Sequence, residues 1–349
     1  MTQISEITKQ EFTQQKGSSQ EVSKQSTLKK QALLMNLKGT MKGTMLLCNL
    51  ILKNPRTFRR FRVMRPGEER YVRPSRQYEL PAYRDDMRYC ASDKKYLRST
   101  QWCNPREPEV VAMANQLGAY ELADYEFADA ALEFLRNNLF LEICPFESAG
   151  STLKRGTGSC YHITNVFVAL CRAAGIRARY ALTPMKLTEE EQNLEFGGMD
   201  PLISMFSEVI FFALSANATI EVEGEVYLNG KWVTACPAAS PEIAAVRRRP
   251  IKKLGEGEAN ILPEAVAGQT IYLESLPSEA ARVLKFLQWL TPGPLERVNV
   301  RYRQEYQIGR KRLEEAGGAE AYDSRAREMY SLLSLRTEFR QDTAIVFRE

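Results

Sequence analysis

The 349-residue sequence contains only one histidine, His162, and this scarcity limits the catalytic sites that the chain can build. Any site that needs an imidazole base has this one side chain to use. The seven cysteines are an odd number without a short paired spacing; they are Cys48, Cys90, Cys103, Cys144, Cys160, Cys171 and Cys236. We therefore expect free thiols in a reducing compartment, with no metal site and no cofactor.

Long apolar runs are also missing. No stretch reaches the 18 or more apolar residues of a membrane-spanning helix. The first residues lack the basic and then apolar layout of a secretory signal, and the chain has neither a P-loop nor a dinucleotide fingerprint. These absences predict a cytoplasmic protein that binds no nucleotide cofactor.

Positive charge is concentrated at the amino-terminal end. Residues 1–98 hold 21 Lys and Arg against 9 Asp and Glu, whereas the rest of the chain holds 27 against 34. Residues 1–28 are rich in Gln, Ser, Thr and Lys, which predicts a disordered tail. Residues 29–97 are expected to form a basic arm.

Within this arm, residues 33–55 have helix-like apolar spacing up to Asn54-Pro55. We expect this amphipathic helix to pack on the main body, and peripheral contact with an anionic membrane is the alternative. Residues 55–76 interleave arginines with aromatic residues, but no stacking module accompanies them. We therefore do not expect a nucleic-acid partner.

The patterns from about residue 98 onward predict an α+β protein. Apolar spacing predicts helices over 104–118, 124–142, 160–174 and 201–214, and Gly175 ends the third of them. A strand is expected at 177–182, and alternation around Asn229-Gly230 predicts a β-hairpin over 218–237. The tail from about residue 260 is expected to be mostly helical.

The chemically suggestive stretch is GTGSC at residues 156–160, directly before the predicted third helix. A cysteine at a helix amino terminus is favoured as the thiolate, because the helix dipole and unpaired amides stabilise negative charge. Glycines before it let the backbone approach a bound carbonyl group, and the Cys160 N–H is a candidate oxyanion donor. A structural cysteine in a small-residue turn is the competing interpretation.

Four segments in this order resemble the transglutaminase-like superfamily, a papain-related cysteine fold: the helix after CNPREPEV, STLKRGTGSC, LCRAAGIRARY and EVYLNGKWV. The resemblance covers residues 98–240. It implies that Cys160 attacks an acyl group, while a histidine that opens the hairpin strand acts as base and an aspartate after the tryptophan motif orients that histidine.

Two of these three positions depart from the family pattern. The histidine position is filled by Glu221 and the aspartate position by Cys236, while His162 is two residues from Cys160 on one helix. Glu221 is the candidate carboxylate base, and a shifted alignment would give that role to Glu223, Glu225 or Glu208. Further candidates are Trp102 as a lining of the acyl pocket, Cys236 as a second thiol and His162 as a relay; for each, a structural role is the competing interpretation.

Two functions remain open from the sequence. The first is cysteine-dependent acyl chemistry, namely acyl transfer, thioester cleavage or cyclisation on a small-molecule or carrier-bound substrate. The second is a catalytically silent binding or scaffold protein with the same fold. In either case we expect a core over 98–245, a helix bearing the cysteine packed on an antiparallel sheet, and a helical extension over 246–349.

Overall fold

The computed structural model describes residues 51–64, 66–185, 219–256, 270–276 and 292–331, together with Met45, Cys48, Asn49, Lys285, Gln288 and Trp289. It divides the chain into two compact units, Met1–Phe58 with Lys186–Thr219 and Arg59–Met185 with Ile220–Glu349. Few residues of the first unit are described. The predicted tail 1–28, most of the helix predicted over 33–55, the helix predicted over 201–214 and Glu208 lie outside the described residues.

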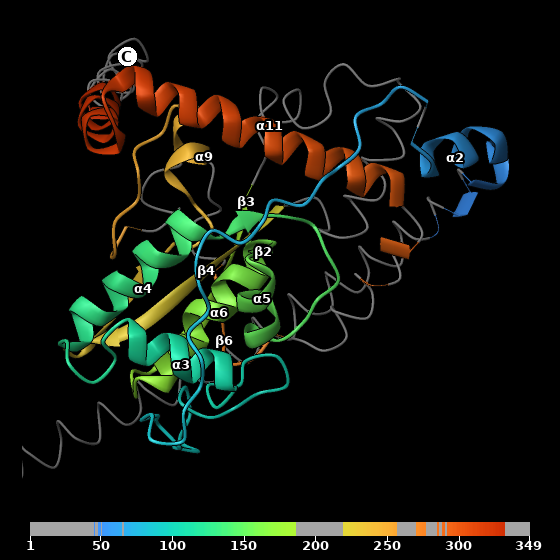
Figure 1. Cartoon of the computed structure of the whole chain (residues 1–349). Coiled ribbons are helices and arrows are strands. Elements are labelled where there is room, and N and C mark those ends of the chain that lie inside the picture. Colours follow the sequence, from blue (N-terminus) through green and yellow to red (C-terminus); the bar gives the residue numbers. More distant parts are fainter. Residues whose placement is uncertain are drawn as a thin grey trace, which may run out of the picture. The chain divides into compact units, whose positions relative to one another are not determined.

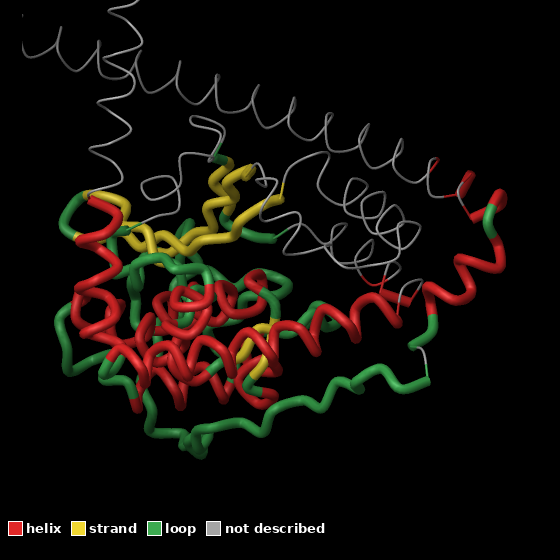
Figure 2. The backbone as a smooth tube through the Cα atoms, turned by 90° about the horizontal axis from the view of Figure 1, so that it is seen from above, coloured by secondary structure: helices red, strands yellow, loops and turns green. Residues whose placement is uncertain are grey.

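The second unit contains a helical layer against a four-stranded sheet (Figures 1 and 2). The helices of this layer are α3 (Pro108–Gln116), α4 (Asp124–Asn138), α5 (Ala149–Arg155) and α6 (Cys160–Ala173). The strands are β3 (Ala178–Met185), β4 (Thr219–Leu228), β5 (Lys231–Ala235) and β6 (Ile271–Leu273), in the order β5-β4-β3-β6. Antiparallel pairs join β3 to β6 and β4 to β5, so the α+β class predicted from the sequence is confirmed.

Helix α6 is the centre of this arrangement, because every residue from His162 to Ala173 is buried. Its Phe167 packs on β4 at Gly224, where an added Cβ would come within 2.6 Å of the ring. The hydroxyl of Thr164 donates to the carbonyl of Val222 at 2.9 Å. A helix that is apolar almost all round is expected only where other elements cover all its faces.

The carboxyl end of α6 is fixed by the buried Arg172. Its guanidinium donates to the backbone carbonyls of Ala178, Arg98 and Glu274. One side chain thereby joins the helix to β3, to the amino-terminal arm and to the segment that follows β6. Gly175 has φ 86, as expected for the residue just after a helix.

The hairpin forms where the sequence predicts it. Asn229 and Gly230 have φ values of 48 and 82, both positive, which a two-residue turn of type I′ requires. The turn pairs Leu228 with Lys231 and, counting outward, Gly224 with Ala235. Val222, Gly224 and Val226 lie on the strand face toward α6, and alternation assigns Glu223 and Glu225 to the opposite face.

Several elements differ from the sequence-based expectation. The second predicted helix ends at Asn138 rather than at residue 142, because Leu139 is extended and β1 (Phe140–Leu141) pairs in parallel with β2 (Thr157–Gly158). Helix α5 lies between the helices predicted over 124–142 and 160–174, where the sequence pattern predicts no element. The tail contains β6, although its long helix α11 (Pro292–Ala316) and the helical residues 319–331 agree with a mostly helical tail. Helix α9 (Pro241–Val246) packs on α11.

The basic arm is partly described. Helix α2 (Pro55–Arg62) follows Asn54, and residues 66–100 run as an irregular strap along the second unit. The arginines of this strap make intramolecular contacts: Arg70 with Glu296, Arg73 with Glu142, and Arg76 with the carbonyl of Lys154. The interleaved arginines and aromatic residues are therefore explained, in part, by packing. Among the described residues, no helix has the length and hydropathy needed to cross a membrane.

Candidate active site

Cys160 is the first residue of α6, as the sequence predicts. Ser159 precedes it as the N-cap with an extended backbone, φ −73 and ψ 173. The thiol is not in a disulfide, and the residue is half-buried against the hydrophobic core. The positive end of the helix dipole favours the thiolate at this position.

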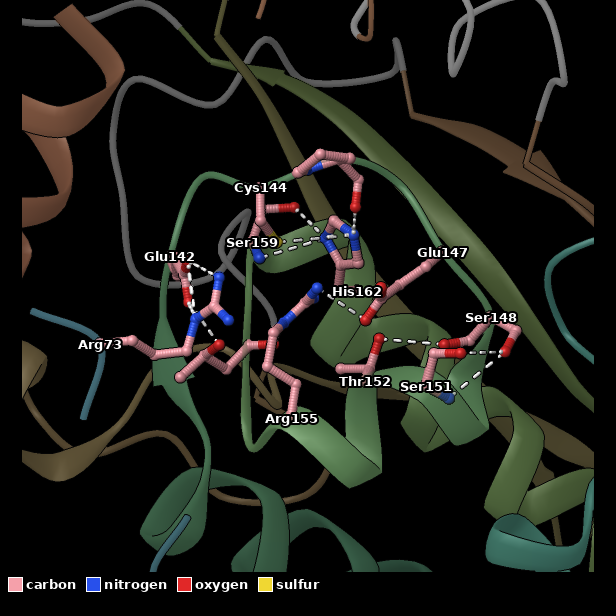
Figure 3. A network of polar contacts seen from close by, with 12 residues as sticks. Arg73, Glu142, Cys144, Glu147, Ser148, Ser151, Thr152, Arg155, Ser159 and His162 are labelled. Atoms are coloured by element: carbon pink, nitrogen blue, oxygen red, sulfur yellow. Dashed lines mark hydrogen bonds and ion pairs between the residues drawn. The ribbon is translucent and has the colours of Figure 1, made fainter. Parts of the chain in front are cut away.

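His162 is a structural partner of the helix start rather than a base aimed at a substrate. It is only 1% exposed. Its Nδ1 accepts the backbone N–H of Ser159 at 3.2 Å and lies 2.8 Å from the Ser159 hydroxyl (Figure 3). Because Nδ1 accepts an N–H, the ring proton is on Nε2, which donates to the carbonyl of Pro145 at 3.0 Å. Both nitrogens are thus used, and we assign no relay role to His162.

Burial lowers the pKa of His162 to about 4, and the nearby Arg155 acts in the same direction. Imidazole is therefore neutral at physiological pH. Below pH 6.5 the imidazole of His162 becomes protonated in the unfolded chain, whereas in the folded protein it stays neutral until about pH 4. Protonation therefore favours the unfolded state between pH 6.5 and about pH 4. The contribution of the neutral His162 to the free energy of unfolding is fully present above pH 6.5 and is lost as the pH falls through this range.

Replacing His162 with Gln should remove this pH dependence while keeping a side chain that can complete the capping box. We expect the free energy of unfolding of the wild type to fall by about 2 kcal/mol more than that of H162Q between pH 7 and pH 5. Urea unfolding at both pH values measures this difference. Equal losses in the two proteins would show that His162 does not titrate in this way.

The glycines before Cys160 have structural explanations. Gly156 ends α5 in the left-handed conformation, with φ 75. At Gly158 an added Cβ would lie 2.5 Å from the Cβ of His162. Packing accounts for both residues, so the glycine loop does not by itself indicate catalysis.

A polar network holds the segment that leads to Cys160 (Figure 3). The carboxylate of Glu142 accepts three hydrogen bonds from Arg73, with distances of 2.8, 2.9 and 3.1 Å, and it also accepts from the hydroxyl of Thr157. Burial alone would raise the pKa of Glu142, but these partners outweigh it and hold the pKa below its ordinary value. The network fixes β1 and β2 on either side of α5.

Cys144 lies in the same network and was not predicted as a site residue. Its Sγ is 3.8 Å from Nε2 of His162. Burial raises the pKa of this thiol to about 11, which makes Cys144 a poor nucleophile despite the neighbouring imidazole. We therefore do not treat Cys144 and His162 as a catalytic pair.

Cys236, which the sequence resemblance predicts at the position of the family's aspartate, belongs to a buried polar cluster. Its thiol donates to Oε1 of Glu223 at 2.8 Å and lies 3.5 Å from Nζ of Lys252. All three residues are 5% exposed or less. The structure thus brings Cys236 together with one of the alternative carboxylates, Glu223, and adds a lysine that the sequence did not suggest.

The remaining carboxylates are placed differently. The backbone of Glu221 lies in β4, but its side chain is outside the described part of the structure, so its role stays a prediction. Glu225 forms an ion pair with Arg179 at 2.6 Å, and that guanidinium stacks on Trp232 and Tyr272. Burial raises the pKa of Glu225, and Arg179 opposes the rise. Glu225 is therefore engaged in a structural pair.

Trp102 lies beside the first turns of α6. Its carbonyl accepts the side-chain amide of Asn165 at 2.8 Å, and its ring meets Phe146 edge to face with centroids 5.1 Å apart. Phe146 in turn contacts Tyr161, the neighbour of Cys160. The buried indole N–H of Trp102 has no hydrogen-bond acceptor in the described structure.

Over the described residues, no group of three or more His, Cys, Asp or Glu could hold a metal ion.

Comparison with known families identifies the domain. Residues 111–237 match the family model of the transglutaminase-like superfamily. This stretch of the chain is therefore similar to a transglutaminase-like domain. The matched residues include Cys160 at the start of helix α6.

Two further comparisons complete this result. A solved structure of a candidate cysteine protease from Cytophaga hutchinsonii is 16% identical, with a TM-score of 0.30, over 51% of this chain and 50% of that one. The matched region therefore spans about half the length of that protein. A search of curated proteins gives no match.

Proposed function

We propose that the transglutaminase-like domain performs acyl chemistry in which Cys160 is the nucleophile and the substrate is an activated acyl group, above all a thioester on a small molecule or a carrier. The observation that carries the proposal is the half-buried Cys160 thiol at the first position of α6 in a transglutaminase-like domain. This placement favours the thiolate form of Cys160. It also provides backbone N–H groups at the helix start that can donate to the oxygen of the reacting carbonyl.

The chemistry of His162 decides which acyl groups suit this site. Amide cleavage needs an acid that protonates the amine leaving group. The chain has one histidine, and it is neutral, buried and hydrogen-bonded through both nitrogens. A thioester needs no such acid, because its leaving group departs as a thiolate. The site therefore fits activated acyl groups better than peptides.

The proposed reaction proceeds in two steps. The Cys160 sulfur adds to the thioester carbonyl, the Cys160 N–H stabilises the oxyanion, and the substrate thiolate leaves. Water or an amine then attacks the acyl-cysteine and releases Cys160. Solvent accepts the thiol proton of Cys160 in the first step and the proton of the attacking group in the second.

Intact mass spectrometry after treatment with an acetyl thioester tests the proposal. We expect one acetyl group on the wild-type protein, mapped to Cys160, and none on Cys160→Ala. Cys90→Ala is a matched control, because Cys90 is also half-buried and also outside any disulfide, and it should still be acetylated. Acetylation of several thiols at equal rates, or no acetylation at all, would rule out the proposal that Cys160 is the nucleophile of an enzyme.

The alternative function is a catalytically silent binding protein. The observation that favours it is the Cys236 cluster, because a thiol engaged with Glu223 and Lys252 stands where the family has an aspartate. Under this alternative Cys160 is inert in the acetylation experiment. The two functions are therefore separated by the same measurement.

Trp102 supplies a further prediction for the acyl site. Its buried N–H, without an acceptor in the described structure, is a candidate donor to a substrate oxygen. Replacing Trp102 with Phe keeps a ring beside Phe146 but removes this donor, so we expect thioester turnover to fall about tenfold. Trp232→Phe on the hairpin is the control and should change turnover less than twofold. An unchanged rate in W102F would assign Trp102 to packing alone.

A further inference from the structure

A second site is indicated by a pocket between the strap, β1 and α11. Its volume is about 180 Å³. Tyr71 and Gln77 line it from the strap, Phe140 from β1, and Arg303, Tyr306 and Arg310 from α11. Cys160 does not line this pocket, and nothing in the proposed acyl chemistry uses it.

The pocket has an aromatic wall. The rings of Phe140 and Tyr306 meet edge to face, with centroids 5.0 Å apart. The hydroxyl of Tyr306 is used by the backbone of β1, since it accepts the N–H of Leu141 at 3.3 Å. These rings therefore form a fixed apolar surface. A cavity of about 150 Å³ with such a lining is large enough for one benzene ring.

The charge of the lining is entirely positive. Arg303 and Arg310 are its charged residues, and no acidic side chain lines it. They are seven residues apart on α11, which places them on one face of the helix and about 10 Å apart along its axis. The nearby carboxylate of Glu142 is paired with the guanidinium of Arg73, so it offers little repulsion to an anion.

These two arginines differ from the other arginines of α11. Arg297 pairs with Glu68, Arg301 pairs with Glu305, and Arg312 donates to the carbonyls at the end of α9. Within the described parts of the chain, Arg303 and Arg310 have neither a hydrogen bond nor an ion pair. Arg303 is half-buried and Arg310 is exposed. Guanidinium groups that line a cavity without a protein partner are suited to bind an oxyanion.

We propose that this pocket binds a phosphate monoester whose organic part is a flat apolar group. The phosphate carries close to two negative charges at neutral pH, which match the two arginines, and its oxygens suit the planar guanidinium. The ring lies against Phe140 and Tyr306, where the volume admits one aromatic ring. This site is independent of Cys160.

Isothermal titration with phenyl phosphate as the probe tests the proposal on the full-length protein. We expect saturable binding with one site per chain. Arg303→Gln and Arg310→Gln should each weaken it at least about tenfold, because each loses a charge-assisted contact. Lys311→Gln is the matched control, since Lys311 is an exposed neighbour on the same helix and does not line the pocket. It should alter the affinity less than twofold.

Three related probes separate the contributions of charge and ring. Inorganic phosphate, which lacks the ring, and benzoate, which has a single charge, should each bind at least about tenfold more weakly than phenyl phosphate. Phenol should not bind measurably. Absence of phenyl phosphate binding at millimolar concentration, equal affinity of R303Q, R310Q and the wild type, or equal affinity for benzoate would overturn the proposal. Circular dichroism confirms that the arginine variants are folded.

Discussion

Replacing Cys160 with serine is expected to lower thioester turnover by about 10³-fold or more. Serine keeps the size of the side chain and its place at the start of α6, but its hydroxyl is a far weaker nucleophile than a thiolate. The loss corresponds to about 4 kcal/mol of transition-state stabilisation. Release of the free thiol from an acetyl thioester, followed by a colorimetric thiol reagent, measures the rate.

Cys90→Ser provides the control, because it removes another half-buried thiol outside the helix start and should leave turnover within twofold. Glu221→Gln tests the carboxylate predicted from the sequence: turnover between those of C160S and the wild type would assign it as a base, and turnover equal to the wild type would remove that role. If C160S and the wild type turn over thioester equally, Cys160 is not the nucleophile. In that case the silent binding function is the one that remains.

The second large effect concerns Gly309, at the contact between α11 and α9. A Cβ at this position would collide with the backbone of Glu242, and it would lie only 2.7 Å from the Glu242 Cα. Backbone atoms cannot rotate out of the way as a side-chain end can. Gly309→Val should therefore lower the free energy of unfolding by more than about 3 kcal/mol.

Urea unfolding followed by circular dichroism measures this loss. Ile308→Ala is the control, because Ile308 is the preceding residue and is 48% exposed, so its truncation should cost less than about 1 kcal/mol. A G309V protein as stable as the wild type would show that α9 and α11 do not pack as closely as the structure indicates.

The parts of the fold that the sequence predicts are those with long or distinctive local signals. Helix α6 has apolar residues on all sides and ends at a glycine, and the hairpin has an Asn-Gly turn. In both cases the local chemistry and the tertiary contacts favour the same conformation. The family resemblance rests on these same segments and is confirmed over residues 111–237.

The elements that sequence analysis missed are short and depend on tertiary contacts. Helix α5 has seven residues, and its signals are caps: the Ser148 hydroxyl accepts the N–H of Ser151, and Gly156 closes the other end. Strand β6 has three residues and pairs with β3 from about 90 residues further along the chain. Neither has enough periodicity to identify an element.

Some features of the candidate site could be predicted from the sequence, and others could not. Cys160 could be identified from its position before a helix, whereas the role of His162 depends on Pro145, which comes from another loop. The pairing of Cys236 with Glu223 was open to prediction. A two-residue turn at 229–230 pairs 228 with 231, and counting outward it pairs 223 with 236. Lys252 approaches this pair from outside the hairpin, so no local pattern indicates it.

The most direct test of the account is the pH dependence of Cys160 alkylation by iodoacetamide, followed by peptide mass spectrometry with Cys90 as the internal reference. Ionisation favoured by the helix terminus predicts that Cys160 reacts faster than Cys90 at pH 7. It also predicts a half-maximal rate below pH 8.5, the ordinary value for a free thiol. A half-maximal rate at or above that pH, with Cys160 no faster than Cys90, would contradict the assignment of Cys160 as a nucleophile.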